Sequence, residues 1–349
     1  MRTRNGDVSV GKVVGLGHRP IVVVSLLAIA CGCVAQAPQS TDAPALSTTS
    51  YPVKPIRIIE PFGVGGGPDL LARALAPRLA SLWGQAISVE NVTGGGATAG
   101  PERVANLPAD GYTLLINTNA QAYSAAFAKH LHYRPLDDFI PIIPLTRQPY
   151  VLVAGKATGV KNIGELIAKG KTAPGGLTFG STGTGTFTHI GGVAFSQAAG
   201  INAVHVPPLP TDSNADMMAN AVAGRFAFAF APISLALPHI RDGTLVALGV
   251  STARRSTVLS EVPTIAESGL QGFDFPIWYG LWVRAGTPAV VVAKLERDLK
   301  QVLADPEMLD WISVHGGERF SMSQAEFAGF VRSESERAKR LVGGGVETE

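Results

Sequence analysis

Short apolar runs alternate with amphipathic stretches along the first third of the chain. A short β-branched run indicates a strand, and apolar residues at a period of 3.6 indicate a helix. This pattern predicts strands at Ile56–Ile59, Ala86–Glu90 and Tyr112–Ile116, and helices at Leu70–Trp83 and Pro101–Asn106. Pro77 lies inside the first helix, and we expect it to kink that helix or to end it near Ala76.

The same alternation restarts at Tyr150. It predicts strands at Val151–Ala154, Leu177–Phe179, Val204–Val206, Phe226–Phe230, Leu245–Val250 and Trp278–Val283. The helices expected between and after them are Ile163–Lys169, Ile190–Ala199, Ala215–Ala223, Ile233–Ile240, Val290–Leu303 and Gln324–Leu341. Strands and helices that alternate at this spacing predict parallel βαβ units in doubly wound sheets.

The loops that follow the predicted strands are rich in glycine and hydroxyl residues. In open parallel sheets, ligands bind beyond the carboxyl ends of the strands. The loops 62–68, 92–98 and 117–120 all lie at such ends, and a further loop runs from Gly180 to His189. We therefore expect a binding site where these loops meet.

The loop after the first strand opens a helix. Pro68 suits the first helical position, and Asp69 complements the positive end of the helix dipole. The glycines before them leave backbone N–H groups free to bind an anion. The loop is not a P-loop, because no Gly-Lys-Ser/Thr follows, and it lacks the dinucleotide fingerprint.

The loop Gly180–His189 permits a second interpretation. Ser181, exposed at a strand-to-helix turn with His189 nearby, could be the nucleophile of a hydrolase. Its Gly-Ser-Thr-Gly spacing departs from the nucleophile elbow, and Ser251 comes nearer to that spelling but is followed by two arginines. A secreted serine hydrolase stays an alternative.

Length and charge point to an exported protein of two domains. Arg2, Arg4, Lys12 and Arg19 precede a ten-residue apolar run, which is too short to span a bilayer and is typical of an export signal. The first 37 residues hold four of the 29 Lys/Arg and one of the 27 Asp/Glu, so 25 basic and 26 acidic residues remain. This balance gives no support for nucleic-acid binding.

Cysteine occurs only at Cys31 and Cys33, at the end of the apolar run. Disulfides and cysteine-based metal sites in the mature chain are thereby excluded. Small residues precede both cysteines, so either is a candidate for lipidation, and cleavage after Ala35 or Ala37 is the other option. We expect a signal peptide over 1–35 and a flexible tether over 36–50.

The remaining chemistry favours binding over catalysis. The seven histidines include no pair at a helical metal-binding spacing. The residues expected in the cleft are Gly, Thr, Ser and Asn, which hold a ligand without changing it, whereas an enzyme normally shows a base or nucleophile there. We expect no metal, no cofactor and no catalytic residue.

Ten short segments between Tyr51 and about Val342 carry a family resemblance. They are Tyr51–Ile56, Pro61-Phe62, Gly65–Arg73, Gly84-Gln85, Val89–Asn91, Asp110–Leu115, Phe179–Ser181 with Gly183 and Gly185, Val262–Gly269, Trp278 with Gly280-Leu281, and Ala285–Pro288. In this order and spacing they resemble the substrate receptors of tripartite tricarboxylate transporters, often called Bug receptors.

The resemblance implies an α/β, type II periplasmic binding protein fold, with two doubly wound lobes and a ligand cleft between them. Lobe 1 would comprise 51–150 plus 277–349, and lobe 2 would comprise 151–276. In that family the loops after the first strand and before the mid-chain helix grip a carboxylate. The ligand-binding residues expected here are Phe62, Gly63, Val64, Gly65, Gly66, Asp69, Thr118, Asn119, Ala120, Ser181, Thr182, Gly183, Thr184, Gly185, Thr186 and His189.

The chain departs from the family pattern in the second lobe. Segment 208–231 lacks the usual Tyr-Lys-Gly, and Ala227 and Ala231 stand where acids are common, so the ligand stays unidentified. Glu60 also stands where a β-branched residue is usual. We expect a periplasmic monomer that captures a small organic acid for membrane permease subunits, with a ligand sensor feeding a signalling partner as the alternative.

Overall fold

The computed structural model describes residues 51–127, 130–206 and 213–343. The expected signal peptide, the tether and both cysteines, Cys31 and Cys33, lie outside these ranges. Part of the departing segment 208–231, from 208 to 212, also lies outside them. No helix in the described ranges has the length and apolar character needed to cross a membrane.

Within the described ranges, the first sheet contains six strands in the order β11-β4-β10-β3-β1-β2. Their bounds are β1 Ile56–Glu60, β2 Ile87–Asn91, β3 Thr113–Thr118, β4 Phe139–Gln148, β10 Ile277–Arg284 and β11 Glu318–Arg319. Strand β1 pairs in parallel with β2 and β3, so Ile58 lies opposite both Val89 and Leu114. The carboxyl ends of these three strands therefore lie at one edge of the sheet.

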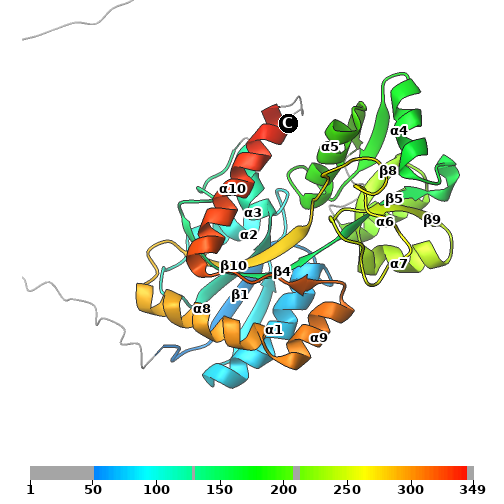
Figure 1. The fold of residues 1–349 in the computed structure, drawn as a ribbon. Coiled ribbons are helices and arrows are strands. Elements are labelled where there is room, and N and C mark those ends of the chain that lie inside the picture. The colour runs from blue at the N-terminus through cyan, green and yellow to red at the C-terminus, as the bar shows by residue number, and fades with distance from the viewer. Residues whose placement is uncertain (1–50, 128–129, 207–212, 344–349) are drawn as a thin grey trace, which may run out of the picture. The chain divides into compact units, whose positions relative to one another are not determined.

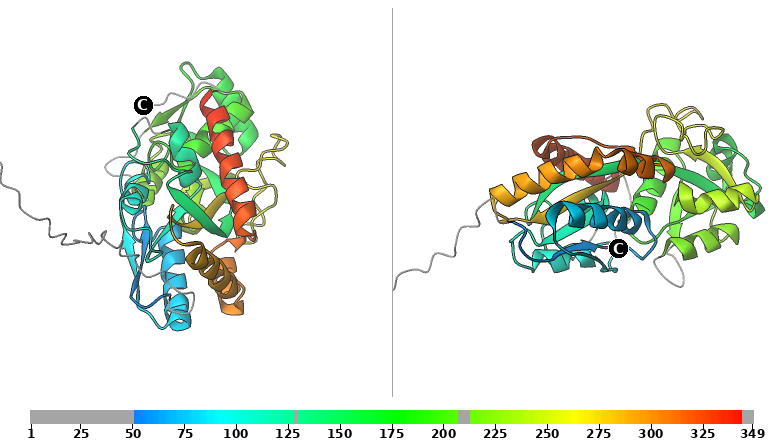
Figure 2. Two further views of the ribbon diagram at one scale, coloured as in Figure 1. Left: turned by 90° about the vertical axis from the view of Figure 1, so that its left-hand side faces the viewer. Right: turned by 90° about the horizontal axis from the view of Figure 1, so that it is seen from below.

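Helices cover both faces of this sheet (Figures 1 and 2). One face carries α1 (Gly67–Trp83), α8 (Ala289–Leu303) and α9 (Pro306–Val314), and the other carries α2 (Ala99–Ala105), α3 (Ala120–Phe127) and α10 (Gln324–Gly343). Alternate residues of β10 face opposite sides of the sheet, so this strand packs against helices on both sides. Trp278 and Trp282 pack against Phe327 of α10, whereas Tyr279 faces Gly67 at the start of α1.

The second sheet has the strand order β7-β6-β8-β5-β9 in the described residues. Its strands are β5 Tyr150–Gly155, β6 Leu177–Gly180, β7 Ala203–Val206, β8 Phe228–Pro232 and β9 Leu245–Val250. Figure 1 shows α4 (Ile163–Thr172) and α5 (Phe187–Ala199) on one face, and α6 (Asn214–Val222) and α7 (Ile233–Arg241) on the other. A 3₁₀ turn, Lys156–Thr158, follows β5.

Alternation along β5 and β8 builds a separate apolar layer on each face of this second sheet. Leu152, Phe228 and Phe230 belong to the layer under α4 and α5. Their neighbours in sequence, Val151 and Ala229, belong to the layer under α6 and α7. Because both faces are buried, the strands read as continuous apolar runs in the sequence.

The α/β class and the two-lobe fold are confirmed, and in both sheets the predicted parallel strand pairs are joined by antiparallel ones. Strand β10 runs antiparallel to β3 and β4, and β5 runs antiparallel to β8 and β9. Strand β5 opens the second sheet directly after β4 and Pro149, and β10 returns to the first sheet. The predicted lobe boundaries at 150/151 and 276/277 stay predictions.

Several element boundaries also differ from the expectation. Helix α1 does not end near Ala76 but continues through Pro77, because Leu79 and Trp83 beyond it are buried. Burial of these side chains outweighs the hydrogen bond that the proline removes. The pattern did not predict α3, α9 or β11, and it placed the start of β8 two residues early. The predicted strands given above also lack the ten-residue β4.

Candidate functional site

Glycines set the backbone conformation of the loop between β1 and α1. Gly66 caps α1 with extended backbone and no side-chain bond, and Gly65 has φ +82°, which favours glycine. Gly63, Val64 and Gly65 are exposed, with Val64 at 77%. Gly67 must be glycine as well, because the hydroxyl of Tyr279 occupies the place of a Cβ.

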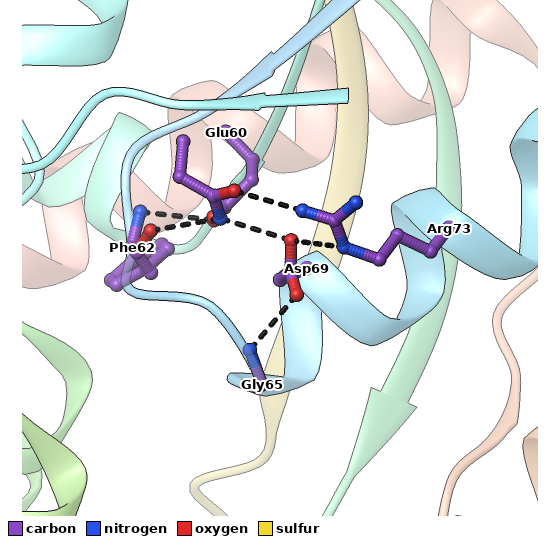
Figure 3. A network of polar contacts seen from close by, with 6 residues as sticks. Glu60, Phe62, Gly65, Asp69 and Arg73 are labelled. Atoms are coloured by element: carbon purple, nitrogen blue, oxygen red, sulfur yellow. Dashed lines mark hydrogen bonds and ion pairs between the residues drawn. The ribbon is translucent and has the colours of Figure 1, made fainter. Parts of the chain in front are cut away.

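Two N–H groups of this loop bind carboxylates of the protein itself (Figure 3). Asp69, 1% exposed, accepts a hydrogen bond from Gly65 N–H at 2.9 Å and another from Arg73 Nε at 2.9 Å. Glu60, which is fully buried, accepts one from Phe62 N–H at 2.9 Å. No acceptor in the described residues engages the N–H groups of Gly63 and Val64.

The two carboxylates have pKa values shifted in opposite directions. Burial raises the pKa of Glu60 to about 8, although Phe62 and Asn91 donate hydrogen bonds to it. Burial would also raise the pKa of Asp69, but the hydrogen bonds from Arg73, Gly65 and Asn91 outweigh it and hold that pKa below its ordinary value. Asp69 was expected to contact the ligand; it turns instead toward its own helix and loop.

Neutral side chains hold the loop before α5. Thr188 Oγ1 accepts a hydrogen bond from Thr182 N–H at 2.9 Å, and Ser181 Oγ accepts one from Gly183 N–H at 3.0 Å. His189 Nδ1 accepts one from Gly185 N–H at 3.2 Å. Thr186 is the N-cap of α5, so the predicted start at Ile190 is corrected to Phe187.

His189 is a buried, uncharged residue of this loop. Burial, with the neighbouring His205, lowers the pKa of His189 to about 3. Its ring stacks on Phe179 at 5.9 Å between centroids and meets Phe127 edge-on at 5.7 Å. The imidazole therefore acts as a hydrogen-bond acceptor and packing group for the loop.

The structure does not show the exposed serine that the hydrolase interpretation needs. Ser181 is fully buried, and its Oγ lies 2.7 Å from Nε2 of His205. Ser251 is also fully buried, and its Oγ accepts a hydrogen bond from Tyr150 N–H at 3.0 Å. Both hydroxyls brace the backbone in this conformation.

The third expected loop segment is buried at the start of α3. Thr118 Oγ1 accepts a hydrogen bond from Ala120 N–H at 3.1 Å, and Asn119 N–H donates to Trp278 O at 3.2 Å. Asn119 is fully buried, and neither atom of its side-chain amide has a partner in the described residues.

A cavity of about 490 Å³ brings the two glycine-rich loops together. Its lining includes seven of the expected residues, which are Phe62, Gly63, Val64, Gly65, Gly66, Thr182 and Thr186. The other expected residues lie outside the lining: Asp69, Thr118, Asn119, Ala120, Ser181, Gly183, Thr184, Gly185 and His189. The cavity is therefore formed by the tips of the loops, with the braced residues behind them.

The same cavity is also lined by residues outside the ligand-binding set expected from the sequence, four of them in the loop 92–98 that was expected to reach the site. They are Pro61, Thr93, Gly94, Gly96, Ala97, Ser213, Asn214, Ala215 and Leu235. The glycine run 94–96 was visible in the sequence as a repeat of the first loop's chemistry. Ser213 with Asp216 three residues later is a helix-start signal, and Ser213 is indeed the N-cap of α6.

The electrostatics of this cavity suit an anion. Gly66, Thr186 and Ser213, the N-caps of α1, α5 and α6, all line it. None of the described residues in its lining carries a charge. The positive ends of three helix dipoles therefore face a neutral, hydroxyl-rich space.

A second cavity, of about 390 Å³, contains Arg147, Arg254 and Arg255. Arg147 and Arg254 share Glu318, and Arg255 pairs with Glu267, so each of the three guanidinium groups already has a carboxylate partner. Within the described residues, no group of three or more His, Cys, Asp or Glu is placed to hold a metal ion. The cavity between the glycine-rich loops is the better candidate site.

Two mixed α/β sheets, with a cavity lined by loops at the ends of strands from both, define a solute-binding protein of the two-lobe class. Comparison with known proteins agrees with this class. Residues 71–344 match the family described as "Tripartite tricarboxylate transporter family receptor". The chain belongs to this family.

Individual relatives are similar over most of their length. The chain is 29% identical to protein BugT of Bordetella pertussis, over 84% of this chain and 89% of that protein. It is 28% identical to R. palustris Rpa4515, whose structure was solved with adipate, with a TM-score of 0.75 and coverage of 84% and 98%. MatC from Rhodopseudomonas palustris, with bound malate, is 27% identical, with a TM-score of 0.76 and coverage of 84% and 100%.

Proposed function

We propose that the protein captures a small organic carboxylate outside the cytoplasm and delivers it to the permease subunits of a tripartite tricarboxylate transporter. The observation that carries this proposal is the convergence of three helix N-caps, Gly66, Thr186 and Ser213, on a cavity without charged lining. Family members that hold adipate and malate support a carboxylate as the ligand.

The carboxylate would be held by neutral donors. Gly63 and Val64 offer N–H groups in the first loop, and the hydroxyls of Thr182 and Thr186, which hydrogen-bond to each other in this conformation, line the cavity from the second. Charge-assisted hydrogen bonds of this kind contribute about 1.5–3 kcal/mol each.

Thermal unfolding with a panel of mono-, di- and tricarboxylates, followed by titration calorimetry, tests the proposal. A ligand that binds the native state and not the unfolded chain raises the melting temperature. Adipate and malate belong in the panel, and the matching amides are controls, because they keep the shape and lose the charge. Equal shifts with acids and amides would refute anion capture.

The protein would act by binding alone, as a periplasmic monomer whose lobes close on the ligand. A serine-reactive probe should label neither Ser181 nor Ser251, and labelling at either would revive the hydrolase alternative. Light scattering checks the monomer, and the intact mass of protein from its host tells lipidation at Cys31 or Cys33 from removal of both. Transport of the identified acid should stop when the permease genes are deleted, whereas a purely sensory role would leave transport unchanged.

A further inference from the structure

Beneath the loop Phe62–Gly66 lie two buried carboxylates and one arginine. Asp69 is bound by Arg73 and by Asn91 Nδ2, at 2.9 Å each. Glu60 is bound by Phe62 N–H and contacts the same Asn91 Nδ2. With both acids ionised, this cluster carries one net negative charge, directly behind the N–H groups that are left for an anion.

The hydrogen bonds around Asn91 leave the cluster one donor short. Three acceptors surround its Nδ2: a carboxylate oxygen of Glu60, one of Asp69, and the carbonyl oxygen of Phe62. An amide NH₂ has only two hydrogens. Two buried carboxylates that share one amide group repel each other, and a proton on Glu60 removes the net charge of the cluster.

The groups around Glu60 favour that proton. Among the described residues, the charged or titratable groups that face it are Asp69 and Arg73 on α1 and Tyr279 on β10. Arg73 is committed to Asp69 and Asn91, and β2 faces Glu60 with the neutral amide of Asn91. Burial and the Asp69 charge raise the pKa of Glu60, as stated above.

We propose that Glu60 is a positioning residue that carries a proton while the loop Phe62–Gly66 holds its anion, so that anion binding takes up a proton above neutral pH. This inference rests on the proposed function of the cavity. Binding an anion next to the loop disfavours a second negative charge on Glu60, so the bound state keeps the proton more tightly. The proton comes from the solvent, and only an O–H bond forms.

Titration calorimetry with adipate and malate tests this linkage. At pH 8.5, binding measured in buffers of different ionisation enthalpy should show uptake of about half a proton. The affinity should fall roughly fivefold to tenfold between pH 7 and pH 9.5, which corresponds to a pKa of Glu60 about one unit higher in the complex. A flat profile with no proton uptake would overturn the inference.

Two variants assign the proton. Glu60→Gln keeps the shape and cannot ionise, so its affinity should be independent of pH over this range and its proton uptake should vanish. Glu90→Gln is the matched control on the neighbouring strand, because Glu90 pairs with Arg57 and Arg103 on the surface, and it should keep the wild-type profile. A Glu60→Gln protein that retained the pH dependence would refute the assignment to Glu60.

Carbon-13 spectra of the glutamate carboxyl groups in the wild-type protein provide a readout that needs no variant. One buried glutamate should ionise above pH 7, and saturating adipate or malate should raise its midpoint further. Ionisation of every glutamate below pH 6 would overturn the inference. Binding with a flat pH profile refutes only the proton linkage, whereas failure of every acid in the carboxylate panel to bind at pH 6 refutes the proposed function together with it.

Discussion

The loop Phe62–Gly66 and the loop Ser181–Thr186 are built from similar small residues, yet different groups hold their backbones. Carboxylates of Glu60 and Asp69 bind N–H groups of the first loop. Hydroxyls and a neutral imidazole bind those of the second. Loops of similar composition are therefore held differently: the conformation of the first depends on charged groups, and that of the second depends mainly on neutral hydrogen bonds and packing.

The largest expected effect of a mutation is that of Gly65→Val on the first loop. A valine is strained at φ +82°, and its side chain would stand beside the N–H groups proposed to bind the anion. We expect the affinity for the carboxylate to fall on the order of 100-fold, the equivalent of about two charge-assisted hydrogen bonds. Titration calorimetry with the acid identified by the panel measures it.

Gly84→Val is the matched control for this variant. Gly84, the C-cap of α1, has φ +63° and open space around it, as Gly65 does, but lies outside the cavity lining. Both variants should lose about 1–2 kcal/mol of stability from the backbone strain. Wild-type affinity in Gly65→Val would place the carboxylate elsewhere.

The contributions of Glu60 and His189 to the stability of the protein should be lost at opposite ends of the pH range. Glu60 has a folded-state pKa raised from 4.5 to about 8, so its contribution is fully present below pH 4.5 and is lost as the pH rises to about 8. His189 has a pKa lowered from 6.5 to about 3, so its contribution is present above pH 6.5 and is lost as the pH falls toward 3.

Melting temperatures across pH 4–9 test this contrast. Glu60→Gln should gain stability relative to the wild type as the pH rises, and His189→Gln should gain relative to the wild type as the pH falls. The Glu90→Gln protein should follow the wild type at alkaline pH. Parallel curves for all four proteins would show that neither buried group titrates in these windows.

Thr184→Val should have a smaller effect on the second loop. We expect a loss of about tenfold in affinity, or one hydrogen bond, if the Thr184 hydroxyl reaches the ligand when the lobes close. Thr172→Val, on the exposed face of α4, is the control and should bind as the wild type does. An unchanged affinity in Thr184→Val would restrict the second loop's contribution to Thr182 and Thr186, which line the cavity.

Salt should have the smallest effect. The cavity lining carries no charged side chain in the described residues, so few full charges meet when the anion binds. We expect the dissociation constant to change by less than about twofold between 50 and 500 mM salt. A change of tenfold or more would point to an arginine or lysine that reaches the ligand.

The positions of these loops could be predicted because they depend on local signals. Glycine runs, the proline at position 68 and the apolar runs before them fix where a strand ends and a helix starts. The bracing contacts could not be predicted in this way. Asn91 of β2 contacts Asp69 of α1, and Tyr279 of β10, far along the chain, contacts Gly67.

Burial distinguishes the residues that line the cavity from those that support its loops. Ser181 and His189 have the residue types of a binding or catalytic site, but both are buried and bonded within the second loop. Ser213 shows the reverse case. It looks in sequence like an ordinary helix cap, and only the fold brings that cap to the cavity.

Gly96, in the loop after β2, has a mechanical consequence. With φ +65°, its backbone lies so close to the carbonyl oxygen of Thr184 that this atom occupies the place of a Cβ. Two loops from different sheets thus touch through main-chain atoms, which cannot move aside by changing a side-chain rotamer. The contact leaves no room for a side chain at position 96, so any residue larger than glycine there would force the two loops apart on that side of the cavity.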